Sequence, residues 1–196
     1  MADYEVIASG SVDASAPTTI NITGIPGTFK HLMLSLSAAS TLSSGAATGT
    51  DYVGMRLNGD TASNYGYAAQ IKGDSASGAG TQVRAAFPGQ QALGWLYIPA
   101  RHSGQSTKKF SHTNYYIPLY SGSTFKKAVL TDHVLPFMYD FPSKGNANGI
   151  QMWEGVSGWN NTAAITSIQL ISYEAVISGT SCGFAVNTSY VLSGLA

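Results

Sequence analysis

The chain has 196 residues, of which 44% are hydrophobic and only 10% are charged. This length fits a single all-β domain with a sizeable core. The formal net charge of zero gives no electrostatic basis for binding nucleic acid or an anionic membrane. It favours assembly instead, because copies of a neutral chain repel one another weakly.

The first residues contain no basic region followed by an apolar core, so we expect no secretory signal and synthesis in a cytoplasm. No apolar run approaches the roughly 20 residues that span a bilayer. Cys182 is the single cysteine, which excludes an internal disulfide and a cysteine-rich zinc site.

Strand-like patterns follow one another along the chain, with Gly, Pro, Ser and Asn between them. In 29–37, Leu32, Leu34 and Leu36 alternate with other residues, the period of two that is typical of a strand with one buried face. Similar patterns predict strands over 4–13, 18–25, 51–57, 65–67, 83–87, 92–98, 110–120, 126–138, 150–153, 165–173 and 184–192. Small polar residues predict loops over 38–50, 72–80 and 143–149.

Residues 51–67 predict a β-hairpin around which the rest of the chain is organised. Their first part alternates as a strand, and Asn58-Gly59 follows, the dipeptide that most readily adopts the positive φ angles of a tight turn. The side chains after this turn hydrogen-bond the local backbone and lengthen the connection. Nothing in the segment requires a catalytic role. The residues expected to define this structural hairpin are Arg56, Asn58, Gly59, Asp60, Asn64 and Tyr65.

These patterns predict an all-β protein with little or no helix, because no window sustains the apolar period of a helix. About ten short strands with frequent turns and no helical crossover favour an antiparallel β-sandwich. A jelly roll of two four-stranded sheets fits this length best. We expect residues 1–15 to form an N-terminal extended segment and residues 16–196 to form a single β-sandwich domain.

The residues that usually carry catalysis are sparse and poorly spaced. Asp51 and Asp60 flank one strand and are candidates for a pair of catalytic carboxylates, although they lie at its opposite ends. His102 and His112 are candidates for a metal site across a hairpin, but the histidines lack the spacing that places two ligands on one element. The nucleophile elbow, the P-loop and the dinucleotide glycine motif are absent. The sequence therefore predicts no enzyme activity, no cofactor and no metal, with Cys182 as a small core residue.

Four aromatic residues are expected in loops: Tyr139, Phe141, Trp153 and Trp159. Aromatic rings beside Asn and Asp suit stacking against the sugars of a glycan. They equally suit the core or a subunit contact, where Tyr and Trp are enriched, and both interpretations stay open. The pairs Lys108-Lys109 and Lys126-Lys127 predict solvated charges that block unwanted pairing at a sheet edge.

Three groups of short motifs occur in a characteristic order and spacing. They are ITGIP and FKHL at 22–26 and 29–32, MRLNGD and NY at 55–60 and 64–65, and WNNTAAITSI at 159–168. Along most of the chain they resemble a family of bacteriophage virion proteins with β-sandwich folds, described as structural, tail-fibre or head-associated. The last residues, 191–196, depart from the Leu-Tyr-Gly-Ile-like strand that often closes such proteins. The resemblance implies a non-enzymatic component of the particle, commonly a homotrimer, and it supplies no catalytic residues.

We therefore expect a module on the virion exterior, made in the bacterial host cytoplasm, that serves as a capsid decoration or a short head or tail fibre. Its expected partners are copies of itself and other virion proteins, with no nucleic acid and no membrane. Tyr4, Val6 and Ile7 are the expected attachment strand, because extended termini add to the sheet edge of a neighbour. Two alternatives stay open: an adhesin that binds host surface glycans through the loop aromatic residues, and a cell-surface depolymerase that uses clustered carboxylates.

Overall fold

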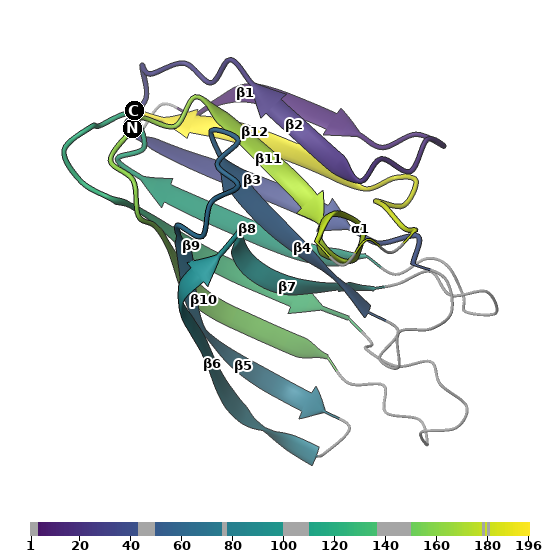
Figure 1. The fold of residues 1–196 in the computed structure, drawn as a ribbon. Coiled ribbons are helices and arrows are strands. Elements are labelled where there is room, and N and C mark those ends of the chain that lie inside the picture. The colour runs from purple at the N-terminus through teal and green to yellow at the C-terminus, as the bar shows by residue number, and fades with distance from the viewer. Residues whose placement is uncertain are drawn as a thin grey trace.

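In a computed structural model, the described residues are 4–42, 50–75, 78–99, 110–136, 150–177, 179 and 181–196. They form two antiparallel sheets packed together, with one short helix, α1 (Tyr173–Val176) (Figure 1). The prediction of an all-β sandwich with little helix is confirmed. Within these ranges, no helix has the length and apolar character needed to cross a membrane.

The larger sheet has eight strands in the order β1-β12-β3-β8-β9-β10-β5-β6. In chain order they are β1 (Tyr4–Ser11), β3 (His31–Ala38), β5 (Tyr65–Ser75), β6 (Gly78–Gln90), β8 (Ser111–Pro118), β9 (Lys127–Leu135), β10 (Gln151–Trp159) and β12 (Ser189–Leu195). The smaller sheet has four strands in the order β2-β11-β4-β7. They are β2 (Thr19–Thr23), β4 (Thr50–Leu57), β7 (Leu93–Pro99) and β11 (Ser167–Ser172).

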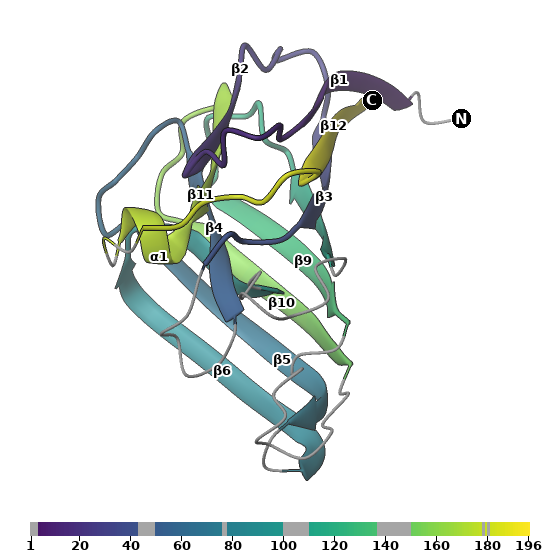
Figure 2. The same ribbon diagram turned by 90° about the vertical axis from the view of Figure 1, so that its right-hand side faces the viewer.

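Eight of these strands have the connectivity of a jelly roll. Strands β1, β12, β3 and β8 are neighbours in the larger sheet, and β2, β11, β4 and β7 form the smaller one. Along the chain these eight strands alternate between the two sheets, except that β4 and β7 pair with each other. The predicted jelly-roll connectivity is therefore confirmed, whereas the prediction of two four-stranded sheets is wrong, because the larger sheet has eight strands. Two further hairpins, β5–β6 and β9–β10, extend the larger sheet beyond β8 and join through the pairing of β10 with β5. Figure 2 shows β5 and β6 reaching past the smaller sheet.

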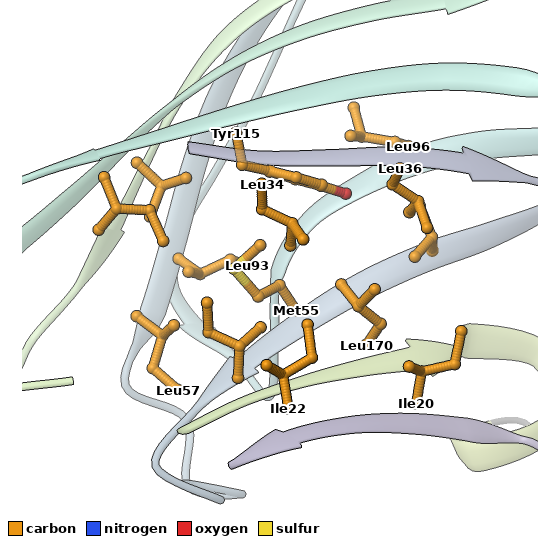
Figure 3. Close-up of a cluster of buried hydrophobic side chains, with 14 of the residues drawn as sticks. Ile20, Ile22, Leu34, Leu36, Met55, Leu57, Leu93, Leu96, Tyr115 and Leu170 are labelled. Atoms are coloured by element: carbon orange, nitrogen blue, oxygen red, sulfur yellow. The ribbon is translucent and has the colours of Figure 1, made fainter. Parts of the chain in front are cut away.

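The core lies between the two sheets, where their inward rows of apolar side chains meet (Figure 3). In β3 every second residue is buried, as the alternation of Leu32, Leu34 and Leu36 predicts. From the smaller sheet, Met55 and Leu57 of β4 join the same cluster. This packing fixes the register of the strands, because a slip of one residue would turn each apolar row towards solvent.

Strand β1 is an edge strand of the larger sheet. It pairs with β12 from Tyr4 to Ser11, with a register shift between Val6 and Ala8. At this shift Ile7 packs against the core, whereas Tyr4 and Val6 remain 58% and 56% exposed. The N-terminal segment is thus extended, as expected, but its described residues belong to the same sheet as the rest of the domain.

The predicted hairpin of 51–67 is wrong, although its turn is right. Asn58 and Gly59 have φ angles of 53° and 68°, and the Asp60 N–H donates to the carbonyl of Leu57 at 3.0 Å, as in a two-residue turn with positive φ. The strands that flank the turn lie in different sheets, because β4 pairs with β11 and β7 while β5 pairs with β10 and β6. Residues 60–64 therefore carry the chain from one layer to the other.

Gly183, in the stretch before β12, lies directly against backbone. A Cβ added there would overlap the carbonyl oxygen of Ala16 and lie 2.8 Å from that of Pro17. We expect Gly183→Ala to lower the free energy of unfolding by about 1–3 kcal/mol, because the main chain has to shift, and urea denaturation measures this. Gly158→Ala is the matched control, since a Cβ at Gly158 meets no atom within 4 Å. Equal losses in the two variants would contradict the argument.

Candidate functional site

The turn after β4 belongs to a polar corner that joins the two sheets. Asn58 Oδ1 accepts hydrogen bonds from the backbone N–H groups of Thr166 at 2.8 Å and Ser167 at 3.2 Å. Its Nδ2 donates to the carbonyl of Ala164 at 2.7 Å. One side chain thus ties this turn to the start of β11, and two of the motif groups in the sequence meet here.

Asp60 is the centre of this corner. Its carboxylate accepts hydrogen bonds from Trp159 Nε1 at 2.8 Å, Asn64 Nδ2 at 2.9 Å and the backbone N–H of Ala62 at 2.8 Å. Burial opposes ionisation, but the hydrogen bonds from Asn64, Trp159 and Ala62 outweigh it and lower the pKa of Asp60 from its ordinary value of 3.8. Because Trp159 belongs to β10, the carboxylate links the turn of the smaller sheet to the larger sheet.

Tyr65 closes the corner from β5. Its hydroxyl donates to the carbonyl of Asp60 at 3.0 Å and accepts from the N–H of Leu57 at 3.1 Å. Its ring stacks with that of Trp159, with the centroids 6.4 Å apart. Burial raises the pKa of Tyr65 to about 12, so the hydroxyl keeps its proton at neutral pH.

The remaining residues of the predicted hairpin are also structural. Gly59 supplies a positive φ, and Asn64 holds the carboxylate of Asp60. Arg56, buried in β4, donates from Nε to the carbonyl of Gln91 at 3.0 Å. The side chains of Arg56, Asn58, Asp60, Asn64 and Tyr65 are thus engaged within the chain, and the corner joins the two sheets.

We expect Asp60→Ala to lower the free energy of unfolding by about 2–3 kcal/mol, because it leaves the buried Nε1 of Trp159 without its acceptor. The folded-state pKa of Asp60 lies below its unfolded value, so this carboxylate stabilises the fold above about pH 4. Its contribution is lost as the pH falls through the folded-state pKa. Urea denaturation should therefore show a difference between wild type and variant that shrinks as the pH falls below about 4.

Asp13→Ala is the matched control for this prediction. Asp13 also accepts a hydrogen bond from a backbone N–H two residues further on, at Ser15, but it is exposed. Its removal should leave the free energy of unfolding unchanged. A difference between wild type and Asp60→Ala that stays constant with pH would contradict the role of the ionised carboxylate.

The placement of two aromatic residues in loops is wrong. Trp153 and Trp159 both lie in β10 and point into the sandwich, with 2% and 1% of their surface exposed. They share a face because they are six positions apart on the strand, and an even offset returns the side chain to the same side. Neither ring is accessible to a sugar, so the core interpretation is confirmed for both. Tyr139 and Phe141 lie outside the described residues.

Asp51 and Asp60 lie at opposite ends of β4, as expected, roughly 20 Å apart along an extended strand. Asp51 is fully buried, and its carboxylate accepts hydrogen bonds from Ser40 Oγ and Ser172 Oγ, each at 2.7 Å. Cys182 Sγ lies 3.6 Å from Ser172 Oγ, and burial raises the pKa of the Cys182 thiol. A protonated thiol is a poor nucleophile.

Across the described ranges, no group of three or more His, Cys, Asp or Glu side chains is placed to hold a metal ion. His112 is exposed on β8. His102 lies outside the described residues, so the candidate pair of histidines stays untested.

The prediction of solvated charges is wrong for one lysine. Lys127 is 4% exposed at the start of β9, and its Nζ donates to the carbonyls of Gly122, Phe125 and Thr162 at 2.7, 2.9 and 2.9 Å. Burial lowers the pKa of Lys127. Its ammonium ties the connection before β9 to the chain after β10, while Lys126 is exposed as expected. The other predicted lysine pair lies outside the described residues.

The outer face of the larger sheet, turned away from the smaller sheet, gathers exposed hydrophobic side chains. Seven of the eleven large ones in the described part of the chain lie there: Tyr4, Val6, Leu130, Val134, Met152, Val156 and Val191. Monomeric proteins rarely group apolar side chains in this way, which makes this face the candidate interaction surface. Sequence reasoning missed it. The available signal was the presence of apolar residues in both alternating sets of 127–135.

One row of this face is apolar and crosses four strands. Met33 pairs with Tyr116, Tyr116 with Leu130, and Leu130 with Val156, across β3, β8, β9 and β10. The ring of Tyr116 also stacks with His31, with the centroids 5.5 Å apart. We call these four paired residues the apolar row.

A second row runs beside it, and on each strand its residue lies two positions away from that of the apolar row. Ser35 pairs with Asn114, Asn114 with Asp132, and Asp132 with Glu154. Ser35 Oγ donates to Asn114 Oδ1 at 2.8 Å, and Glu154 forms an ion pair with Lys72 at 2.9 Å. We call Ser35, Asn114, Asp132 and Glu154 the polar row.

The whole polar row lines a groove of about 540 Å³, together with Met33, Tyr116 and Leu130 of the apolar row. Tyr4 of β1 also lines it, together with Thr131 and Gly155. The groove therefore combines hydroxyl, amide, carboxylate and apolar groups on strands whose backbone positions are fixed by pairing.

No family model matches the chain, and no curated protein matches it. Among solved structures, the chain is similar to an alginate lyase mutant in complex with an alginate trisaccharide, at 11% sequence identity. The match covers 96% of this chain and 88% of that one, with a TM-score of 0.27. A likeness of this size carries no argument about activity or substrate.

Proposed function

We propose that the protein is a non-enzymatic structural component of a bacteriophage virion, placed on the particle exterior as a capsid decoration or a short head or tail fibre. The motif resemblance in the sequence suggests the particle. The open edge of β1 is the structural observation that supports the proposal most, because it offers a means of joining other chains.

Strand β1 pairs with β12 on one side and, among the described strands, has no partner on the other. An open edge presents backbone N–H and C=O groups with which the strand of a neighbouring chain pairs. Proteins that prevent such pairing place Lys or Pro on the edge, whereas Glu5 is the one charged residue of β1. Tyr4 and Val6 are exposed there and Ile7 fastens the strand to the core, which suits the attachment role proposed for them.

Copies of the chain are proposed partners together with other virion proteins. The zero net charge and the low charged fraction leave little repulsion between copies. We expect light scattering on the purified protein to give three times the 20.5 kDa mass of the chain, as a homotrimer does. A monomer would contradict the trimer and would leave the particle lattice as the organiser of the copies.

Incorporation into particles tests the proposed function directly. An antibody against the chain should detect it in density-purified particles from the host strain that carries its gene. We expect Val6→Lys to reduce the amount in particles about tenfold, because a lysine on the edge opposes strand pairing. The substitution replaces an exposed side chain, so the fold should be retained, which circular dichroism checks.

Phe125→Lys is the matched control, since Phe125 is 71% exposed and lies in the connection between β8 and β9, away from the edge. This variant should enter particles as wild type does. Absence of the wild-type chain from particles would reject the virion role. Equal incorporation of the two variants would reject β1 as the attachment strand.

A glycan-binding adhesin is the second candidate function, and the groove on the outer face favours it. The buried Trp153 and Trp159 give this candidate no support. In this candidate function the binding site is the groove on the outer face, which residues of β3, β8, β9 and β10 line.

A further inference from the structure

We propose that the groove on the outer face of the larger sheet binds a linear polysaccharide that carries free amino groups. The inference deepens the adhesin candidate and does not depend on the virion role. It rests on the order of the two rows, on the charges of Asp132 and Glu154 in the polar row, and on the strand pairing that fixes the backbone beneath them.

The two rows repeat in step with the strands. Neighbouring strands lie about 4.8 Å apart, and side chains two residues apart on a strand are separated by about 6.6 Å. Each strand from β3 to β10 in this part of the sheet therefore contributes one apolar and one polar side chain to a track that crosses the strands. A linear glycan has the same two-sided repeat, because each sugar has an apolar C–H face and a rim of hydroxyl groups.

The apolar row provides the surface on which the C–H faces would pack. Leu130 lines the groove and is 48% exposed, so its side chain is accessible to a ligand, and its pairing partner Val156 lies beside the lining at 44% exposed. Tyr116 is held against His31 by ring stacking, which fixes its orientation beside them. A tyrosine ring combines a large apolar surface with a polar end, and Tyr4 adds a second ring to the lining.

The polar row provides the hydrogen-bonding groups. Asn114 Oδ1 is engaged by Ser35 Oγ, which orients the exposed amide so that its Nδ2 remains a donor for a ligand. Beside it, the carboxylate of Asp132 offers acceptors only. Hydroxyl and amino groups of a sugar supply the complementary donors and acceptors.

The charge of the groove selects the class of sugar. Glu154 is compensated by Lys72 in the one ion pair of the described residues, so Asp132 has no cationic partner among them. Asp132 also lies directly opposite Glu154 on the neighbouring strand, and like charges at such positions repel. A sugar ammonium placed beside Asp132 relieves this repulsion, whereas the carboxylate of a uronate strengthens it.

A protein surface is the rival occupant, and the polar row argues against it. The buried centres of protein interfaces are depleted of charged residues, Asp and Glu included. Here Asp132 and Glu154 line the groove together with Ser35 and Asn114. Covering two carboxylates with an apolar protein surface costs more than leaving them beside a hydrated glycan.

Titration calorimetry with defined oligosaccharides tests the proposal. The probes are a chitosan hexamer, whose sugars carry free amines, a fully acetylated chitin hexamer and an alginate hexamer, at a mildly acidic pH that keeps the chitosan amines charged. We expect the chitosan hexamer to bind most tightly, the acetylated hexamer about tenfold more weakly, and the alginate hexamer not at all. Raising the salt concentration should weaken chitosan binding.

Variants assign the binding to the groove. Asp132→Asn should weaken chitosan binding about tenfold, and Leu130→Ala should weaken both chitosan and acetylated hexamers to the same degree. Asp13→Asn and Val191→Ala are matched controls that change exposed residues outside the groove lining, and both should bind as wild type does.

Three outcomes would overturn the proposal: no binding of the chitosan hexamer, binding that Asp132→Asn and Leu130→Ala leave unchanged, or alginate binding as tight as that of chitosan. A lower oligomer mass for Leu130→Ala in light scattering would show instead that protein covers the groove. None of these results bears on incorporation into particles, so failure here is distinct from failure of the virion role.

Discussion

Asp51→Ala is expected to lower the free energy of unfolding by about 3–5 kcal/mol, as removal of a buried polar centre does. The fully buried carboxylate accepts from the hydroxyls of Ser40 and Ser172. It also accepts from the backbone N–H groups of Tyr52 at 2.6 Å and Glu174 at 3.1 Å. The variant would leave these buried donors without an acceptor, at the point where β4, β11 and α1 meet.

Urea denaturation measures this loss, and two variants provide controls. Asp132→Ala removes an aspartate from another strand, but one that is exposed, so a change below about 0.5 kcal/mol is expected. Asp51→Asn keeps the shape and one acceptor oxygen, so its loss should lie between the two. Equal free energies of unfolding for Asp51→Ala and Asp132→Ala would show that the buried hydrogen bonds of Asp51 do not stabilise the fold.

Trp159→Ala should lower the free energy of unfolding by about 3–5 kcal/mol, because it removes a large side chain from the core. The indole is 1% exposed, stacks with Tyr65 and donates to Asp60. Its loss opens a cavity at the corner and releases the carboxylate that holds the chain between β4 and β5. Thermal unfolding followed by circular dichroism provides the measurement.

Trp159→Phe separates the two contributions. It retains most of the ring and removes the Nε1–H donor, so it should cost about 1–2 kcal/mol. Combined with Asp60→Ala, it should add less than the sum of the single losses, because both variants break the same hydrogen bond. Strict additivity would contradict the link between the indole and the carboxylate.

The strands were predictable where one face is buried and the alternation is strict. In 29–37 the leucines occupy every second position, and the structure buries each of them. In β10, Gly155 and Gly158 interrupt the same signal, because glycine is unfavourable in strands, and the local pattern therefore places Trp159 in a loop. A Cβ at Gly155 would lie 3.1 Å from the carbonyl of Ala68, which shows a close backbone approach at this glycine.

Two further features depend on distant parts of the chain. Asn58-Gly59 determines a turn, but no local residue determines whether the following strand pairs with β4 or crosses to the other sheet. The groove likewise requires the register of four strands, because Ser35 and Asp132 become neighbours of Asn114 only when β8 lies between β3 and β9. Alternation within one strand contains no information about this register.

The extension of the larger sheet has a consequence for the order in which the fold assembles. The hairpins β5–β6 and β9–β10 are each local in sequence, but the seam between β10 and β5 joins parts of the chain that β7 and β8 separate. Closing this seam carries the entropy cost of a long loop, so we expect the hairpins to form early and to dock late, after the jelly roll has brought them together. In the native state we expect amide protection against hydrogen exchange to decline from β3 towards the edge strand β6.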